Sequence, residues 1–151
     1  METQLTGQSK AQASQEFPKK LLMLAAAGSA AFWIIDFVIS VSPIAVEYKA
    51  AFSISSLPVA LAEALVGGVV IALFVSLFLL RFFDTIPGKK PIIKALILSF
   101  FVMIIIEVIS ALGNPAHASV YLLLDTGMNG PRFLALGLVI GYLFDKQTEK
   151  V

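Results

Sequence analysis

The chain contains no cysteine and only one histidine, His117. The lack of cysteine excludes disulfide bonds, thiolate catalysis and cysteine-ligated metals, and a lone histidine excludes a multi-histidine metal site within one subunit. The motifs of zinc peptidases, serine hydrolases, P-loop proteins and dinucleotide-binding proteins are also missing, as is the arginine ladder of a voltage sensor. We therefore expect no cofactor, and the sequence leaves the question of a bound metal open.

Charge is scarce as well. Charged residues make up 14% of the 151 residues, whereas a soluble domain carries about 25%. Hydrophobic residues make up 58%, and the mean hydropathy is +0.91, so the chain has too few polar residues to cover itself in water. The basic residues stand in short clusters between apolar runs, which gives no face for nucleic acid. We predict an integral membrane protein whose main partner is the lipid bilayer.

Four apolar stretches divide the chain, at about residues 21–42, 57–80, 92–112 and 131–144. The first three are long enough to cross a hydrocarbon core of about 30 Å as helices. The pattern predicts an all-α, polytopic membrane protein in which residues 19–145 form a four-transmembrane-helix bundle. Residues 1–18 lack apolar periodicity and are expected to form a flexible cytoplasmic tail, with residues 146–151 as a second cytoplasmic tail.

The fourth stretch is short, with a predicted length of roughly 21 Å. Asn129, Gly130 and Pro131 resemble a helix start, with the proline in the first turn. Residues 114–130 are then left as an irregular connection between the third and fourth helices. Two interpretations stay open for them: a re-entrant segment that dips into the membrane, or an amphipathic helix that lies at its surface.

The basic residues predict the orientation. With four spans and the N-terminus inside, the cytoplasmic side holds Lys10, Lys19, Lys20, Arg81, Lys89, Lys90, Lys94, Lys146 and Lys150. The outer side holds only Lys49 and Arg132. Because short loops rich in Lys and Arg stay in the cytoplasm, we expect a multi-pass protein of the cell membrane with both termini inside.

Three acids interrupt the first three apolar stretches: Asp36, Glu63 and Glu107. Each lies about 7–8 Å to the outer side of its predicted span centre. An ionised side chain near the bilayer centre costs roughly 2.5–3.5 kcal/mol, so such acids usually have partners or a function. Arg132 lies on the same side and is expected to bind one of them. The remaining excess of acid predicts that at least one carboxyl holds a proton or faces water or a bound cation.

Three further polar residues belong to this predicted layer. Ser110 and Asn114 follow Glu107 on one helix face and are candidates to help bind a proton or cation. His117 lies just outside the third span, where its ordinary pKa near 6.5 suits a proton relay. The bland interpretation is that these groups only hold the helices together by hydrogen bonds.

Small residues recur every four positions along the second stretch, at Ala60, Ala64, Gly68, Ala72 and Ser76. Such a ridge lets a second helix backbone approach closely, so it predicts a helix-packing interface. The partner is either a helix of the same chain, a second copy in a homo-oligomer, or another membrane protein. Gly137 and Gly141 form a single, weaker GxxxG signal in the last helix.

Three functions follow from these features. The first is membrane transport or a transport-associated role, in which the acids bind protons or a cation. The second is a non-enzymatic accessory or assembly subunit of a larger membrane complex, with the polar layer joining its helices. The third is a membrane enzyme that uses Glu107, His117 and Asp125 on a lipid headgroup; the missing motifs make an enzyme the weaker choice.

Overall fold

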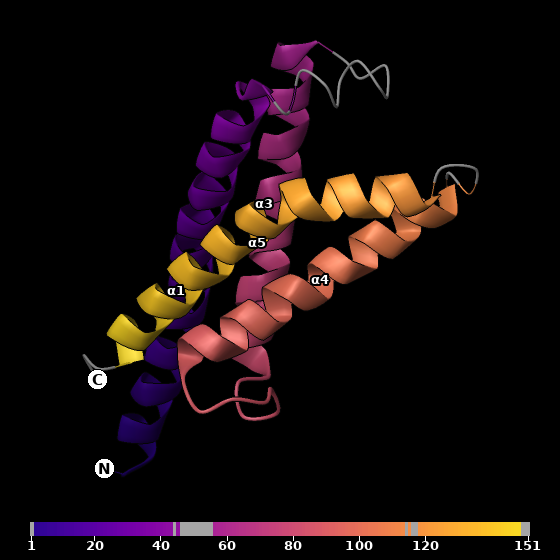
Figure 1. The fold of residues 1–151 in the computed structure, drawn as a ribbon. Coiled ribbons are helices and arrows are strands. Elements are labelled where there is room, and N and C mark those ends of the chain that lie inside the picture. The colour runs from indigo at the N-terminus through magenta and orange to yellow at the C-terminus, as the bar shows by residue number, and fades with distance from the viewer. Residues whose placement is uncertain (1, 44, 46–55, 114, 116–117, 149–151) are drawn as a thin grey trace.

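The computed structural model describes residues 2–43, 45, 56–113, 115 and 118–148. This part of the chain is all helical, as the sequence predicts. It contains four long helices, α1 (Glu2–Ser40), α3 (Leu57–Arg81), α4 (Pro91–Gly113) and α5 (Ala118–Thr148). The helices form two antiparallel pairs, α1 with α3 and α4 with α5, and the pairs cross each other at an angle (Figure 1). The α3–α4 turn and the C-terminal end of α5 lie at the same end of the molecule.

The small-residue ridge of α3 packs against α1 of the same chain. A methyl group added at Gly68 would lie 3.0 Å from the ring of Phe32, and one added at Gly28 would lie 3.5 Å from the side chain of Ala72. Trp33 adds a hydrogen bond across the pair, from its indole Nε1 to the carbonyl oxygen of Leu61 at 3.1 Å. Of the remaining ridge residues, Ser76 is buried, and Ala60 and Ala64 are half-buried.

The closest backbone approach lies between α4 and α5. A methyl group at Gly141 would lie 2.5 Å from Cα of Ile92, and one at Gly137 would lie 3.1 Å from Cα of Leu96. The weak GxxxG signal therefore marks the tightest helix contact of the described chain. Only glycine allows two backbones to come this close.

Two helix boundaries differ from the sequence prediction. The helix α1 begins at Glu2, so the segment predicted as a flexible cytoplasmic tail, residues 1–18, is helical from its second residue. Alanine, glutamine, glutamate and lysine are good helix formers and can extend a helix out of a span without apolar periodicity. Residues 118–130, predicted to be irregular, belong to α5, which continues through Pro131.

The polar residues around Pro131 form one face of α5, whereas the sequence prediction assigned those before the proline to an irregular connection. Asp125, Asn129 and Arg132 are spaced by four and three residues, which places them on one side of α5. On this side Asn129 bonds to Glu107 of α4, and Arg132 pairs with Asp36 of α1. Proline lacks the backbone N–H that would bind the carbonyl oxygen of Gly127, so α5 carries a local break in its hydrogen bonding here. The break does not end the helix.

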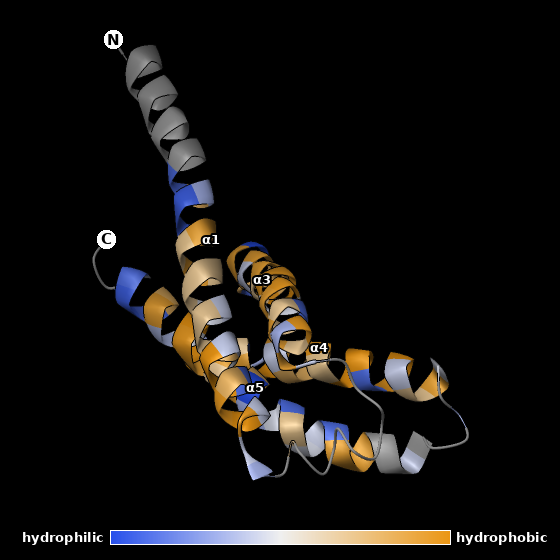
Figure 2. Cartoon of the chain, turned by 90° about the horizontal axis from the view of Figure 1, so that it is seen from above, coloured by the Kyte–Doolittle hydropathy of each residue, from blue (hydrophilic) through white to orange (hydrophobic). Residues whose placement is uncertain are grey.

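Three helical segments are long and apolar enough to cross a membrane: Glu16–Ser40, Leu57–Arg81 and Pro91–Gly113. Figure 2 shows the apolar residues along them, with hydrophilic residues gathered at the C-terminal end of α5 and around its middle. These segments support a multi-pass membrane protein. The helix α5 does not reach the same apolar content among the residues described.

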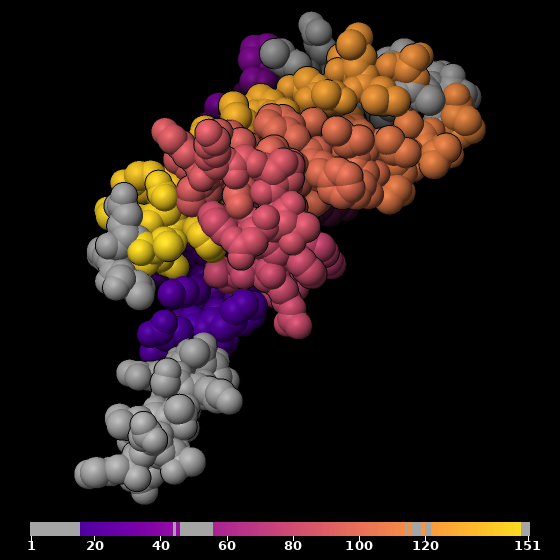
Figure 3. Space-filling view, turned by 90° about the horizontal axis from the view of Figure 1, so that it is seen from below, coloured from indigo at the N-terminus to yellow at the C-terminus, as the bar shows by residue number. Residues whose placement is uncertain are grey.

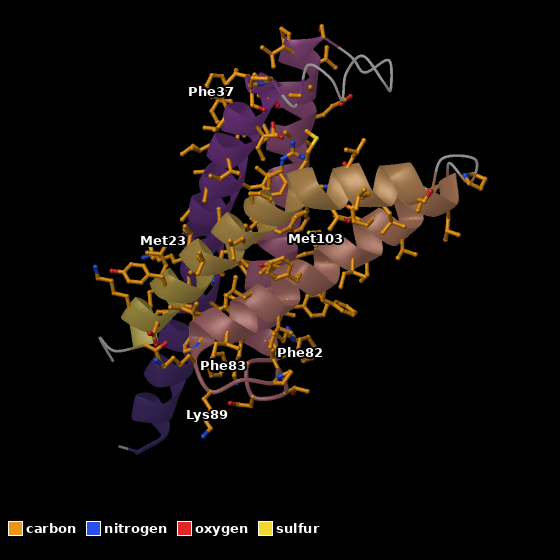
Figure 4. All side chains as sticks on the ribbon, in the orientation of Figure 1. Met23, Phe37, Phe82, Phe83, Lys89 and Met103 are labelled. Atoms are coloured by element: carbon orange, nitrogen blue, oxygen red, sulfur yellow. The ribbon has the colours of Figure 1, made fainter. Side chains whose placement is uncertain are left out.

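A buried lysine fixes the α3–α4 turn. The Nζ atom of Lys94 donates a hydrogen bond to the carbonyl oxygen of Phe83 and lies 3.9 Å from the centre of its ring. The same ring stacks on Phe144 at 4.9 Å, which joins the turn to the end of α5. Figure 3 shows the segment around the α3–α4 turn beside the end of α5, and Phe83 is labelled in Figure 4. The exposed side chain of Lys89 extends away from the bundle.

Candidate functional site

The centre of the candidate site is an ion pair between α1 and α5. The Nη2 atom of Arg132 lies 2.6 Å from Oδ1 of Asp36, and the side chains are 14% and 5% exposed. Asp36 lies one turn before the end of α1, and Arg132 follows the proline of α5 directly. A buried acid needs a counter-charge, and Arg132 supplies it, as the sequence suggested.

Asn129 extends this ion pair to α4. Its Oδ1 accepts a hydrogen bond from Nη1 of Arg132 at 2.7 Å, and its Nδ2 donates one to Oε1 of Glu107, also at 2.7 Å. Both the oxygen and the nitrogen of the Asn129 amide are therefore hydrogen-bonded. Because Arg132 can only donate, the amide oxygen faces Arg132 and the amide nitrogen faces Glu107. The result is a hydrogen-bonded row from Asp36 through Arg132 and Asn129 to Glu107, which connects three helices.

Asp125 completes the row, which we call the polar network. It lies one turn before Asn129 on α5, close enough for its side chain to act on the carboxyl group of Glu107. Carboxylates only accept hydrogen bonds, so two carboxyl groups can bond to each other only when one of them carries a proton. Arg132 and Asp125 are the charged groups whose electrostatic effect reaches Glu107. Arg132 is paired with Asp36. Two carboxylates held close together repel each other, so a proton held between Glu107 and Asp125 would relieve this repulsion.

The other predicted site residues lie elsewhere. Glu63 is exposed on α3, and Ser110 is half-buried on α4. Asn114 and His117 fall outside the described residues. The structure therefore brings together two of the three intramembrane acids with Arg132.

The sequence analysis missed Asn129 as a network residue and considered Asp125 only for the enzyme alternative. Their spacing relative to Arg132 was the available signal, because it places all three on one helix face.

An apolar layer closes the network toward the end that carries the termini. Phe32 of α1 and Phe133 of α5 meet edge to face, with ring centres 5.4 Å apart and planes at 87°. Met103 lies one turn below Glu107 on α4 at the centre of the bundle (Figure 4). Phe133 and Leu136 are almost completely buried. No continuous row of polar groups is therefore seen to leave the network in this direction among the described side chains.

Among the residues described, no group of three or more histidine or acidic side chains stands in an arrangement that could hold a metal ion. Searches of protein-family models, curated proteins and solved structures found no match to this chain.

Proposed function

We propose that the chain is a four-span membrane protein in which α5 is the fourth span. At 31 residues, α5 is about 46 Å long, which exceeds the hydrocarbon core of about 30 Å. Its polar residues face α4 and α1, while Leu123, Leu134 and Leu138 are exposed. The inward-facing polar groups lower the apolar content of α5 without exposing charge to lipid.

We place the protein in the cell membrane. In the proposed orientation both termini and the α3–α4 turn lie in the cytoplasm. The support is the nine basic residues on that side against two on the other. In this orientation the polar network lies in the outer half of the bilayer.

The function that this arrangement supports best is proton binding in membrane transport or in a transport-associated role. The observation that carries it is the close approach of two carboxyl groups, Glu107 of α4 and Asp125 of α5, in a network whose arginine is paired with Asp36. A carboxyl pair that shares one proton can release and rebind it, and intramembrane acids of this kind form proton sites in pumps and transporters.

A second candidate is an accessory or assembly subunit of a larger membrane complex. The ion pair of 2.6 Å between α1 and α5 favours it, because hydrogen bonds and ion pairs between helices also serve to hold membrane bundles together. The buried part of the α3 ridge is used within the chain. A second copy or another membrane protein on α3 would contact its exposed face, which includes Val66 and Val70.

Infrared difference spectroscopy on the protein in lipid vesicles separates the two candidates. A proton site predicts a band of protonated carboxyl that disappears as the pH is raised. Glu107→Gln should remove the band, and so should Asp125→Asn, because the two groups share the proton. Glu63→Gln is the matched control and should leave it, since Glu63 is exposed and outside the network.

A purely structural network predicts no band that both depends on Glu107 and Asp125 and changes with pH. That result would reject proton binding at this pair. A bound cation in place of the proton would also give no band, but thermal stability would then rise with the concentration of that cation.

A further inference from the structure

The two halves of α5 are held by different forces. In the second half, from Pro131 onward, five residues are buried, and Gly137 and Gly141 bring its backbone against α4. In the first half, residues 118–130, Asn129 is the one buried residue among the side chains described. A methyl group at Gly127 or Gly130 would meet no atom within 4 Å.

The first half of α5 also lies beyond α1. The ion pair of Arg132 with Asp36 and the contact of Ile140 with Gly28 define an antiparallel register between the two helices. In this register Ser40, the last residue of α1, falls opposite Met128. Among the described residues, the part of α5 before this residue therefore lies beyond the end of α1 and runs along α4 (Figure 1).

Hydrogen bonds consequently hold the first half in place. In lipid, apolar side chains gain little by leaving the bilayer for a helix contact, so association depends on close packing and on hydrogen bonds. Close packing is provided by the second half of α5. The first half has the bonds of Asn129 to Glu107 and Arg132, and Asp125 lies close to Glu107.

We propose that residues 118–130, which carry Asp125, form a gate over Glu107, hinged at Gly130–Pro131 and latched by Asn129. The missing N–H of Pro131 removes one backbone bond between the halves, so bending costs less here than elsewhere in the helix. Opening would connect the acids with the end of the bundle where α4 and α5 are joined. The apolar layer of Phe32, Met103 and Phe133 stays closed on the other side. This inference rests on the proposed function for the purpose of the gate.

Cysteine accessibility tests the gate in this cysteine-free chain. Ala111→Cys places a thiol on the buried face of α4, one turn beyond Glu107, under the first half of α5. Ser99→Cys is the matched control, because Ser99 is fully buried against the second half at Gly137. Both are measured at one pH in detergent with a hydrophilic thiol reagent.

Asn129→Leu removes the latch while leaving an uncharged side chain of similar size. It should raise the labelling rate at position 111 by at least about tenfold, because hydrogen bonds to charged groups are lost. Labelling at position 99 should not change. An unchanged rate at position 111 would overturn the proposal, and so would a parallel rise at both positions, which would indicate a loosened bundle.

Pro131→Ala provides an independent arm if the Asn129 variant does not fold. It restores the missing backbone donor and should slow labelling at position 111; an equal or faster rate would reject the hinge. Labelling does not depend on proton binding. If the wild-type protein shows no pH-dependent infrared band but labelling at position 111 responds as expected, the proposed function alone is rejected. If the band is present but labelling at position 111 does not respond, the gate alone is rejected.

Discussion

The ion pair between Asp36 and Arg132 allows a quantitative prediction. Arg132→Gln leaves the carboxylate of Asp36 buried, at 5% exposure of its side chain, without its counter-charge. Removing one partner of a buried pair typically costs about 3–5 kcal/mol. We expect a loss of this size in the free energy of unfolding.

The double variant makes the prediction specific. Adding Asp36→Asn removes the unpaired charge, so the double variant should be more stable than the sum of the single losses implies, by about 0.5–3 kcal/mol. Glu63→Gln is the control and should change stability by no more than about 0.5 kcal/mol, because its side chain is exposed.

Trp33 is suited to the measurement. It is the one tryptophan of the chain, and it donates its hydrogen bond across the α1–α3 contact. Its fluorescence during denaturation of the detergent-solubilised protein therefore reports separation of these helices. Strictly additive losses for Arg132→Gln and Asp36→Asn would refute the assignment of the pair as an energetic unit.

Three other predictions test the packing and the topology. Gly141→Leu should prevent folding to a single species on size-exclusion chromatography, because even a methyl group at this position would collide with the α4 backbone. Gly67→Leu should be tolerated, because a methyl group there would meet no atom within 4 Å. Equal tolerance of the two variants would contradict the α4–α5 contact. In intact cells, a cysteine at Gly88 should resist an impermeant external thiol reagent and one at Ser119 should react, and the reverse pattern would invert the proposed topology. Lys94→Met should make the α3–α4 turn more sensitive to limited proteolysis by removing its hydrogen bond and its contact with the aromatic ring; unchanged cleavage would mean that the turn holds without the lysine.

The intramembrane acids show how far the sequence alone could lead. Asp36 and Glu107 interrupt apolar stretches, and an acid there needs a partner, so their role in a polar network was predictable. Glu63 gives the same signal but is exposed. Five residues before Gly68, it lies about 140° around the helix from that glycine. Gly68 faces Phe32 of α1, so the position of Glu63 relative to Gly68 could have separated this acid from the other two.

The remaining misses concern α5. A proline after Asn129 and Gly130 is a common helix start, yet the helix runs through it. The deciding information is tertiary, because the polar residues before the proline find partners on α4 that the local sequence does not reveal. The hydrogen-bonded contact of Asn129 with Glu107 joins residues far apart in the chain, and no local pattern specifies such a pairing.

The separation of Asp36 from Arg132 has a consequence for biosynthesis. Arg132 is made 96 residues after Asp36, which at ordinary translation rates of about 5–20 residues per second is a delay of roughly 5–20 s. During this time the segments of α3 and α4 are synthesised while the counter-charge of Asp36 does not yet exist. In the proposed membrane protein, the nascent first helix therefore enters the bilayer with a protonated aspartate or waits beside the insertion machinery. The ion pair that neutralises Asp36 of α1 can form only after Arg132 of α5 has been synthesised.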